Sequence, residues 1–371
     1  MGPKLYSALI VASIVATLSA IVLTVWWVPP FIGDLTRIGG FSESDFGWNQ
    51  PQQGFGRPLY RYTRNYQDLL ASPSTVVVFG DSFSAPRGDG VGTWADFLAN
   101  RIDESVTVFH YQTTQQLATF IDSESFRANP PAAIILQNVT RNFVWQIALP
   151  DCHLADDLPR SREHGLLPRQ GQLAQATTRR TAYRDLREAL SVSSYFLRAA
   201  GWNAVVPVGQ VRQSDLARDD LFSSRASGRL LTYVADSASL AATPQDIARS
   251  LCTLRTLQAK ATANGRTRFL FVPTPDKSLA YREYVTDEPM PVPPAYAALR
   301  ETPDLEWIDS LAILDGLIGQ GTKDVYLPND THFGSPAAAA VGEAVLSALT
   351  PRNTAPLADR AALTRRLESA D

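Results

Sequence analysis

The feature that most constrains this chain is a run of 24 residues without a charge near its N-terminus. The run extends from Leu5 to Val28 and is longer than the roughly 20 apolar residues that cross a bilayer as a helix. Trp26 and Trp27 lie where the aromatic residues of a membrane interface are expected, and two prolines then end the helix. A cleaved signal peptide has a shorter apolar core with a small-residue cleavage site close behind it. We therefore expect residues 1–30 to form an uncleaved anchor.

The charges beside this run predict the orientation of the anchor. Lys4 and the amino terminus are positive on its short side, whereas Asp34 and Arg37 nearly cancel on the other side. Positive flanks are retained in the cytoplasm. We therefore expect the bulk of the chain outside the cytoplasm.

Composition excludes several classes of function. The formal net charge is −3, so the chain lacks the basic footprint of a nucleic-acid-binding protein. No Cys-x-x-Cys motif occurs, and the Cys152–His153 pair lacks further ligands, so we expect no metal and no cofactor. Cys152 and Cys252 fit an oxidising compartment. The sequence does not fix the distance between them, so a disulfide and two free thiols both remain open.

Beyond the anchor, strand and helix patterns alternate. Residues 31–72 are rich in Gly, Pro, Gln and aromatic residues, which indicates a linker. Apolar runs typical of buried strands lie at 76–79, 105–112, 132–139 and 268–275, and residues 304–314 suggest a strand leading into a helix. Helical patterns lie at 93–102, 123–130, 243–265 and from residue 335 onward. The alternation predicts an α/β domain over residues 73–350 with a parallel sheet covered on both faces.

Two regions depart from this alternation. Residues 150–240 combine a polar loop, a helical pattern at 182–201 and a mixed stretch, and we interpret them as an insertion into the α/β frame. Residues 351–371 follow the last helical pattern and are expected to form a C-terminal tail.

A Gly-Asp-Ser sequence ends the first predicted strand and raises the question of what Ser82 does. The residue is either a nucleophile presented at the end of the strand or the N-cap of the next helix. A serine nucleophile also needs a base and a group that orients the base.

Of the four histidines, His332 has an acid at a suitable spacing. Asp330 and His332 are two residues apart, so in an extended segment their side chains point to the same side. An aspartate in that position holds the imidazole in one tautomer and stabilises the imidazolium. Ser82, His332 and Asp330 are thus a candidate nucleophile, base and orienting acid. The alternative is a structural Asp–His pair before the last helix.

These motifs, in this order, resemble the SGNH/GDSL hydrolase superfamily. The strand ending in Gly-Asp-Ser-Phe and the Asp-Thr-His-Phe block before the final helix are similar to its two ends. Three segments are similar to the alginate O-acetyltransferase-like branch: residues 131–143, 269–285 and 324–345. The resemblance implies a flavodoxin-like α/β/α sandwich with a Ser–His–Asp triad, anchored in the inner membrane with its catalytic domain in the periplasm.

The resemblance also implies roles for further residues. Asn138 or Asn142 corresponds to the superfamily's oxyanion donor, and Arg141 to the arginine that follows the same strand. Lys277 and Tyr281 match the branch's Pro-x-x-x-Lys…Tyr stretch, where Lys277 contacts substrate or caps a strand. The backbone N–H of Ser82 is the oxyanion donor that the sequence itself supports.

Three functions follow from these residues. The first is an O-acetyltransferase that passes an acetyl group through Ser82 to a polysaccharide, with a multi-spanning membrane acyltransferase as donor partner. The second is an esterase that uses water as acceptor. The third is a non-catalytic glycan-binding scaffold, against which the complete set of Ser82, His332 and Asp330 argues.

Overall fold

The computed structural model describes residues 2–27, 30, 32–149, 152, 175–178 and 210–350. The helix expected at 182–201, the tail at 351–371 and most of the insertion expected at 150–240 lie outside these described residues.

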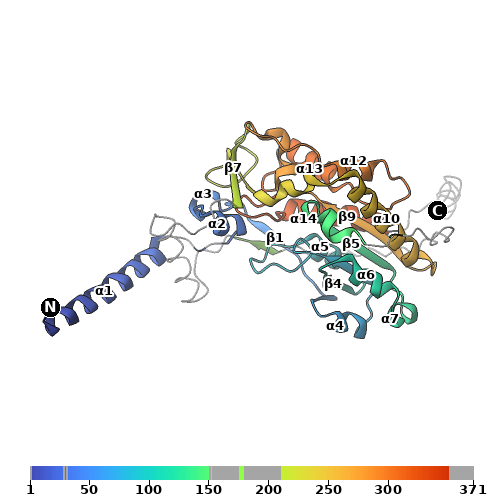
Figure 1. Ribbon diagram of the computed structural model, residues 1–371, viewed down its shortest axis with the longest axis horizontal. Coiled ribbons are helices and arrows are strands. Elements are labelled where there is room, and N and C mark those ends of the chain that lie inside the picture. Colours follow the sequence, from blue (N-terminus) through green and yellow to red (C-terminus); the bar gives the residue numbers. More distant parts are fainter. Residues whose placement is uncertain are drawn as a thin grey trace, which may run out of the picture.

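Five parallel strands form the central sheet, in the spatial order β2–β4–β3–β5–β9. Figure 1 labels β4, β5 and β9 of this sheet. They are β2 (Tyr60–Thr63), β3 (Val76–Gly80), β4 (Val106–His110), β5 (Ala133–Val139) and β9 (Arg268–Thr274). The register pairs Val78 of β3 with Val108 and Ile135, and Ile135 with Leu270. Every residue of β3 and β5 is buried, as in parallel strands covered on both faces. The predicted α/β class with a parallel sheet is confirmed.

Helices cover both faces of this sheet. One face carries α5 (Trp94–Arg101), α13 (Ser310–Gly319) and α14 (Ser335–Leu349). The other carries α4 (Tyr66–Ala71), α6 (Thr114–Ile121), α7 (Glu124–Ala128), α8 (Phe143–Ile147), α10 (Pro244–Thr262) and α12 (Pro294–Arg300). Successive side chains of β3 point to opposite faces of the sheet. Val76 and Val78 therefore pack against the first group of helices, and Val77 and Phe79 pack against the second.

Local sequence explains where the two best-defined helices begin. Thr93 and Asp96 form a capping box at the start of α5, and Thr243 and Asp246 form another at α10. Pro244 occupies the first helical position of α10, where its missing N–H costs nothing. Both starts agree with the helices expected at 93–102 and 243–265.

The other elements are short. They are β1 (Gln52–Gly54), η1 (Thr140–Asn142), β6 (Gln175–Thr177), β7 (Val211–Asp215), β8 (Arg229–Tyr233), η3 (Val234–Ala241), α11 (Lys277–Ala280) and η4 (Arg282–Tyr284). β1 pairs with β6 and β7 with β8, both antiparallel. The strand expected before α13 is reduced to a single parallel bridge between Trp307 and Phe271 of β9.

The segment expected as a linker at 31–72 is instead part of the folded domain. It contains α2 (Asp34–Gly39), α3 (Glu43–Phe46), β1, the edge strand β2 and α4. Leu35 and Phe46 pack against Val211 and Leu231 of the β7–β8 hairpin. These elements are too short to show a hydrophobic period, and their burial comes from contact with remote strands, so the linker prediction is wrong. We call residues 32–48 the stem.

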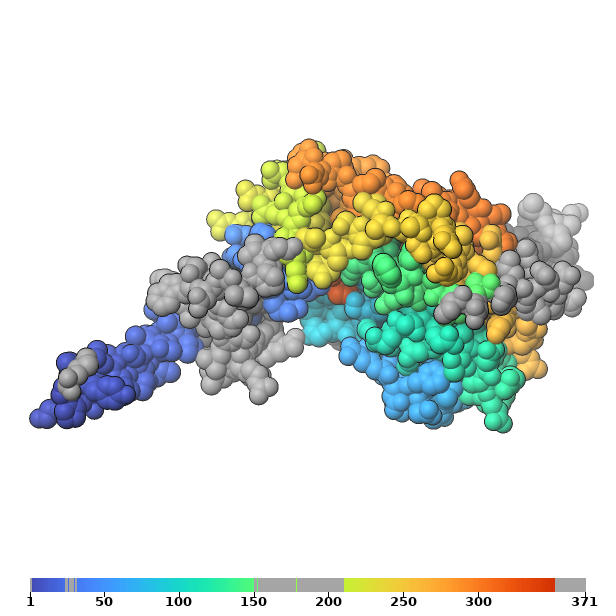
Figure 2. All heavy atoms as spheres, in the orientation of Figure 1, coloured from blue at the N-terminus to red at the C-terminus, as the bar shows by residue number. Residues whose placement is uncertain are grey.

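Helix α1 (Pro3–Trp27) projects away from the domain (Figures 1 and 2). Its stretch Pro3–Leu23 has a mean hydropathy of 2.2, and none of its most apolar part is buried against the rest of the described chain. It is long and apolar enough to cross a membrane, in agreement with the anchor expected at residues 1–30.

A disulfide joins Cys152 to Cys252, with 5.8 Å between the Cα atoms. It connects the chain shortly after α8 to the middle of α10. Of the two states that the sequence leaves open, the structure has the bridged one.

Candidate active site

The strand order gives the sheet a switch point at β3. β4 lies on one side of β3 and β5 on the other, so the connections that leave β3 and β4 run in opposite directions. In open α/β sheets, ligands bind at the carboxyl ends of the strands beside such a point. Ser82 lies two residues beyond the end of β3, at this position.

The turn that carries Ser82 is held by hydrogen bonds within the turn and from β5. The Asp81 carboxylate accepts from the Phe83 N–H at 2.9 Å and from the Val139 N–H at 2.9 Å. The next described helix is α5, which begins twelve residues later at Trp94 and is capped by Thr93. Ser82 is therefore not a helix cap, and its side chain is partly exposed.

Gly80 is required by the tightness of this turn. A Cβ at Gly80 would lie 2.4 Å from the Ser84 Oγ. The Ser84 hydroxyl and the Asp81 N–H both donate to the Gln137 side-chain oxygen, at 2.8 and 2.9 Å. The Gly-Asp-Ser-Phe-Ser sequence thus makes a turn fastened to β5.

Asp330 and His332 lie on a turn, which we call the histidine loop (residues 327–333). Its ends are joined by a bridge between Tyr326 and Phe333, and the Leu327 N–H donates to the His332 carbonyl at 3.1 Å. The extended segment expected here is therefore wrong. The two side chains meet because the Asp330 Oδ1 accepts from the His332 N–H at 2.9 Å, in a local Asx-type turn.

The structure brings the three predicted residues into one hydrogen-bonded chain. The Ser82 Oγ lies 2.8 Å from the His332 Nε2, and the His332 Nδ1 lies 2.6 Å from the Asp330 Oδ1. With Nδ1 protonated towards Asp330, the Nε2 lone pair accepts from the Ser82 hydroxyl. This is the geometry of a nucleophile, a general base and an orienting acid.

Arg87 keeps Asp330, the buried acid of the hydrogen-bonded Ser82–His332–Asp330 chain, ionised. The Arg87 Nη2 lies 3.2 Å from the Asp330 Oδ2, and the same guanidinium pairs with Asp89. Burial alone would raise the pKa of Asp330, but the charges of Arg87 and His332 outweigh it and hold the pKa well below its usual range. Asp330 is therefore a carboxylate whenever His332 takes up a proton.

Of the predicted oxyanion donors, the backbone N–H of Ser82 is free to donate, since it has no hydrogen-bond partner among the described residues. Asn138 is buried, and its amide donates to the Tyr111 hydroxyl at 2.7 Å and to Gln146 at 2.6 Å, so it is not free to donate to an oxyanion. Asn142 is half-buried at the start of α8 and has no side-chain cap hydrogen bond there.

Arg141 belongs to a buried ionic cluster rather than to the Ser82 chain. It pairs with Asp276 and, at 3.3 Å, with Asp236. Burial raises the pKa of Asp276 well above its usual value, and the charge of Asp236 raises it further.

Lys277 and Tyr281 support the histidine loop instead of facing a substrate. The Lys277 side chain is buried and donates to the carbonyls of Leu327 and Pro328, both at 2.8 Å, and of Asp330 at 3.2 Å. The Tyr281 hydroxyl, also buried, accepts from the backbone N–H of Tyr326 at 3.3 Å. Neither of the roles expected for Lys277, substrate contact or strand cap, matches this position.

Sequence reasoning missed the acids that the stem brings to the histidine loop. Asp34 accepts from the Thr331 N–H at 2.8 Å and from its hydroxyl at 2.6 Å. Glu43, which is buried, accepts from the Asn329 amide at 2.9 Å. No local pattern marks Asp34 or Glu43, since their partners lie almost 300 residues away in the chain.

Asp34, Asp330 and His332 also place ligand-type atoms within 4.8 Å of one another. These carboxylate oxygens already accept hydrogen bonds. Arg87 donates to the Asp330 Oδ2, and Thr331 donates to both oxygens of Asp34. The group is organised as an acid–base chain, and we assign no metal to it.

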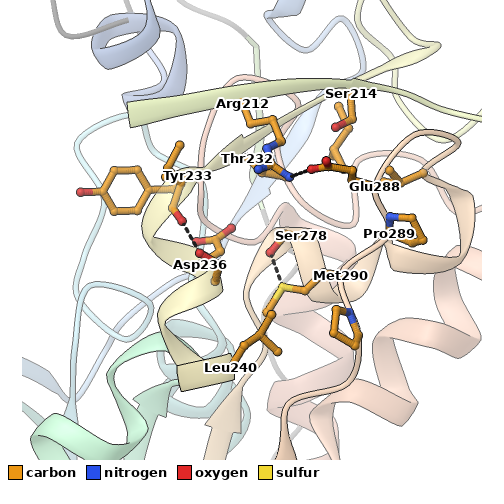
Figure 3. Close-up of a pocket in the computed structure, with 15 residues that line it drawn as sticks. Arg212, Ser214, Thr232, Tyr233, Asp236, Leu240, Ser278, Glu288, Pro289 and Met290 are labelled. Atoms are coloured by element: carbon orange, nitrogen blue, oxygen red, sulfur yellow. Dashed lines mark hydrogen bonds and ion pairs between the residues drawn. The ribbon is translucent and has the colours of Figure 1, made fainter. Parts of the chain in front are cut away.

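A separate cleft lies between the β7–β8 hairpin, η3 and residues 285–291 (Figure 3). Arg212 and Glu288, which line it, form an ion pair of 2.8 Å. Asp236 lines it too, which places the cleft beside the Arg141 cluster. None of the three residues of the Ser82 chain lines this cleft.

Comparisons with protein-family models, with curated proteins and with solved structures gave no match to this chain. The function is therefore inferred from the site itself.

Proposed function

We propose that this protein is a membrane-anchored O-acetyltransferase of the SGNH type, acting on an extracytoplasmic polysaccharide. The observation that carries the proposal is the hydrogen-bonded chain of Ser82, His332 and Asp330 at the switch point of the sheet. The order β4–β3–β5–β9, with the parallel bridge at Trp307 beyond β9, agrees with a flavodoxin-like sheet and supports the same assignment.

The chemistry follows from the geometry of the chain. The Ser82 oxygen attacks the carbonyl carbon of an acetyl donor while the His332 Nε2 takes the hydroxyl proton. The N–H of Ser82 stabilises the oxyanion, and His332 then gives the proton to the departing group, leaving an acetyl ester on Ser82. A sugar hydroxyl attacks this ester, His332 takes its proton and returns it to Ser82, and the acetylated sugar leaves.

The anchor supports an acceptor and a donor outside the cytoplasm. Helix α1 keeps the domain at a membrane, where a multi-spanning acyltransferase would supply acetyl groups. The charges that flank α1 favour an orientation with the domain outside the cytoplasm, and the resemblance to the alginate O-acetyltransferase-like branch implies the periplasmic side of the inner membrane.

Hydrolysis is the second candidate, because the site is open to water. The Ser82 side chain is partly exposed, and the His332 side chain is 19% exposed. If water replaces the sugar hydroxyl in the second half of the cycle, the same residues make an esterase.

Replacing Ser82 by alanine tests the proposal. The purified full-length protein should turn over p-nitrophenyl acetate through an acetyl-enzyme that mass spectrometry locates on Ser82. Ser82→Ala should lower kcat by about 1,000-fold or more while the melting temperature stays close to wild type, since Ser82 caps no helix. Ser44→Ala, at an exposed serine of α3, is the matched control.

The two candidate functions separate in the same assay when a soluble oligosaccharide is added. A transferase releases acetylated sugar at the expense of acetate, whereas an esterase releases acetate alone. Wild-type turnover by a folded Ser82→Ala protein would exclude both.

A further inference from the structure

The stem and the histidine loop are fitted closely to each other. The N–H groups of Leu35 and Thr36 both donate to the Asn329 carbonyl, at 3.1 and 3.3 Å. A Cβ at Gly33 would lie 1.9 Å from the Asn329 carbonyl oxygen, so only glycine allows this approach. Glu43 accepts from the Gly33 N–H at 3.0 Å and from the Asn329 amide, which fixes the stem and the loop with one carboxylate.

Asp34 is the stem residue that reaches the residues of the Ser82 chain. Its two carboxylate oxygens accept the N–H and the hydroxyl of Thr331, the residue between Asp330 and His332. Its own N–H donates to the Asp330 Oδ2 at 3.4 Å. Its Oδ2 lies 4.0 Å from the His332 Nδ1. Asp34 thus contacts the peptide that sets the angle between acid and base.

We propose that Asp34 is a positioning residue of the Ser82–His332–Asp330 chain, which the stem must supply for the chain to work. This rests on the proposed function. Asp34 fixes Thr331 and so keeps the His332 Nε2 within 2.8 Å of the Ser82 Oγ. It also places a second carboxylate beside the imidazolium that forms when Ser82 gives up its proton.

The charges around Asp34 are consistent with this second role. Burial raises the pKa of Asp34 and the charge of Asp330 raises it further, whereas His332 and the hydrogen bonds from Thr331 lower it. From α11, the charge of Lys277 acts on both carboxylates, whereas Arg87 pairs with Asp330 alone. The negative charge of Asp34 therefore stabilises a protonated His332 more than a neutral one.

Asp34→Asn in the full-length protein tests the proposal. With p-nitrophenyl acetate we expect kcat to fall between about 10- and 100-fold with KM within about twofold, because the base is misplaced while the binding surface is intact. The acid limb of the pH–rate profile should move to lower pH by about 0.5–1 unit, the effect of removing a charge some 4 Å away. Asp45→Asn, in α3, removes the same charge from the stem at a side chain that makes no ion pair with the histidine loop.

A double-mutant cycle with Thr331→Val tests the route of the effect. The backbone N–H of residue 331 stays in Thr331→Val, so this variant should lose less activity than Asp34→Asn. If Asp34 acts through Thr331, the double variant should lose little more than Asp34→Asn alone. Additive losses, or an equal loss in Asp45→Asn, would overturn the proposal.

A measurement that needs no turnover separates this inference from the proposed function. In NMR spectra of histidine-labelled protein, the Nδ1–H signal of the His332–Asp330 hydrogen bond should shift or broaden in Asp34→Asn and stay unchanged in Asp45→Asn. An unchanged signal in Asp34→Asn overturns the positioning role of Asp34 even if the enzyme is active. A changed signal in a protein that forms no acetyl-enzyme supports the positioning role and rejects the acetyltransferase.

Discussion

At the scale of single residues, Asp330 shows how a buried carboxylate stays charged. One of its oxygens faces the ring and the N–H of His332, and the other faces Arg87 and the N–H of Asp34. Each neighbour donates a hydrogen bond, and each of these bonds favours the ionised form of Asp330. A carboxylate fixed in this way holds the imidazole in one tautomer and stabilises the imidazolium without taking the proton itself.

Arg87→Met should destabilise the protein by about 3–5 kcal/mol at neutral pH, because it leaves the buried Asp330 without its main positive partner. The folded-state pKa of Asp330 lies below its unfolded value of about 3.9, so the stabilisation is present above that pH and is lost as the pH falls through the folded value. Thermal unfolding at pH 7 and pH 3 measures both effects, with the largest difference from wild type expected at pH 7.

Arg218→Met provides the matched control for this experiment. Arg218 pairs with Asp220 at the surface, where neither side chain is buried, so its loss should change stability much less than the loss of Arg87 at pH 7. If Arg87→Met unfolds no earlier than Arg218→Met at pH 7, Arg87 does not hold Asp330.

The candidate chain could be predicted from the sequence, but the residues that hold it could not. Ser82 ends a strand pattern, and Asp330 and His332 lie close together in the chain, so local spacing suggested all three. Arg87 and Asp34 meet Asp330 across 243 and 296 residues. Such contacts depend on the tertiary fold, and no periodicity or turn signal marks them.

At the scale of elements, the histidine loop is held by hydrogen bonds with α11 on one side and with the stem on the other. The Lys277 ammonium donates to carbonyls on one side of the loop, and Glu43 binds the Asn329 amide on the other. The carbonyls of Leu327, Pro328 and Asp330 and the amide of Asn329 therefore have partners outside the loop. This explains how an irregular segment can hold His332 at hydrogen-bond distance from Ser82.

Lys277→Met should flatten the pH dependence of stability above neutral pH. Burial lowers the pKa of Lys277 to about 7, although Asp330 and other carboxylates oppose this shift. Between pH 7 and about 10, the unfolded chain holds a proton that the folded protein has lost, so the free energy of unfolding rises with pH by up to about 1.4 kcal/mol per unit. Denaturant unfolding at pH 7 and pH 9 should show this rise in wild type and not in Lys277→Met. Equal slopes in both proteins would mean that Lys277 stays charged throughout.

The elements that the sequence predicted well are those with strong local signals. The buried strands β3, β4, β5 and β9 are short apolar runs, and α5 and α10 begin with capping boxes. The stem has neither signal. Its helices have six and four residues, and its Gly-rich and aromatic composition is also typical of a linker.

At the scale of the whole molecule, the anchor and the candidate active site are joined by a very short connection. Asp34, which contacts the histidine loop, follows Trp27 at the end of α1 by seven residues, so a fully extended chain separates them by at most about 25 Å. A small core of Ile32 and Trp48 from the stem, with Val91 and Leu327, fixes the stem beside both loops that carry the Ser82 chain. If α1 lies in a membrane, Ser82 works close to the membrane surface.

Lengthening this connection should leave the reaction at Ser82 unchanged and reduce the supply of acetyl groups to it in cells. A flexible Gly/Ser insert of about 20 residues at positions 28–31 adds roughly 25 Å of mean reach and leaves the docked stem intact. Turnover of p-nitrophenyl acetate by the purified protein should stay at the wild-type level, because every residue around Ser82 is kept. Acetylation of polysaccharide in cells should fall, because a donor held in the membrane then meets Ser82 at a lower effective concentration. The same insert after Thr350 is the control, and undiminished acetylation at equal protein levels would show that the acetyl donor does not depend on the distance between the site and the membrane.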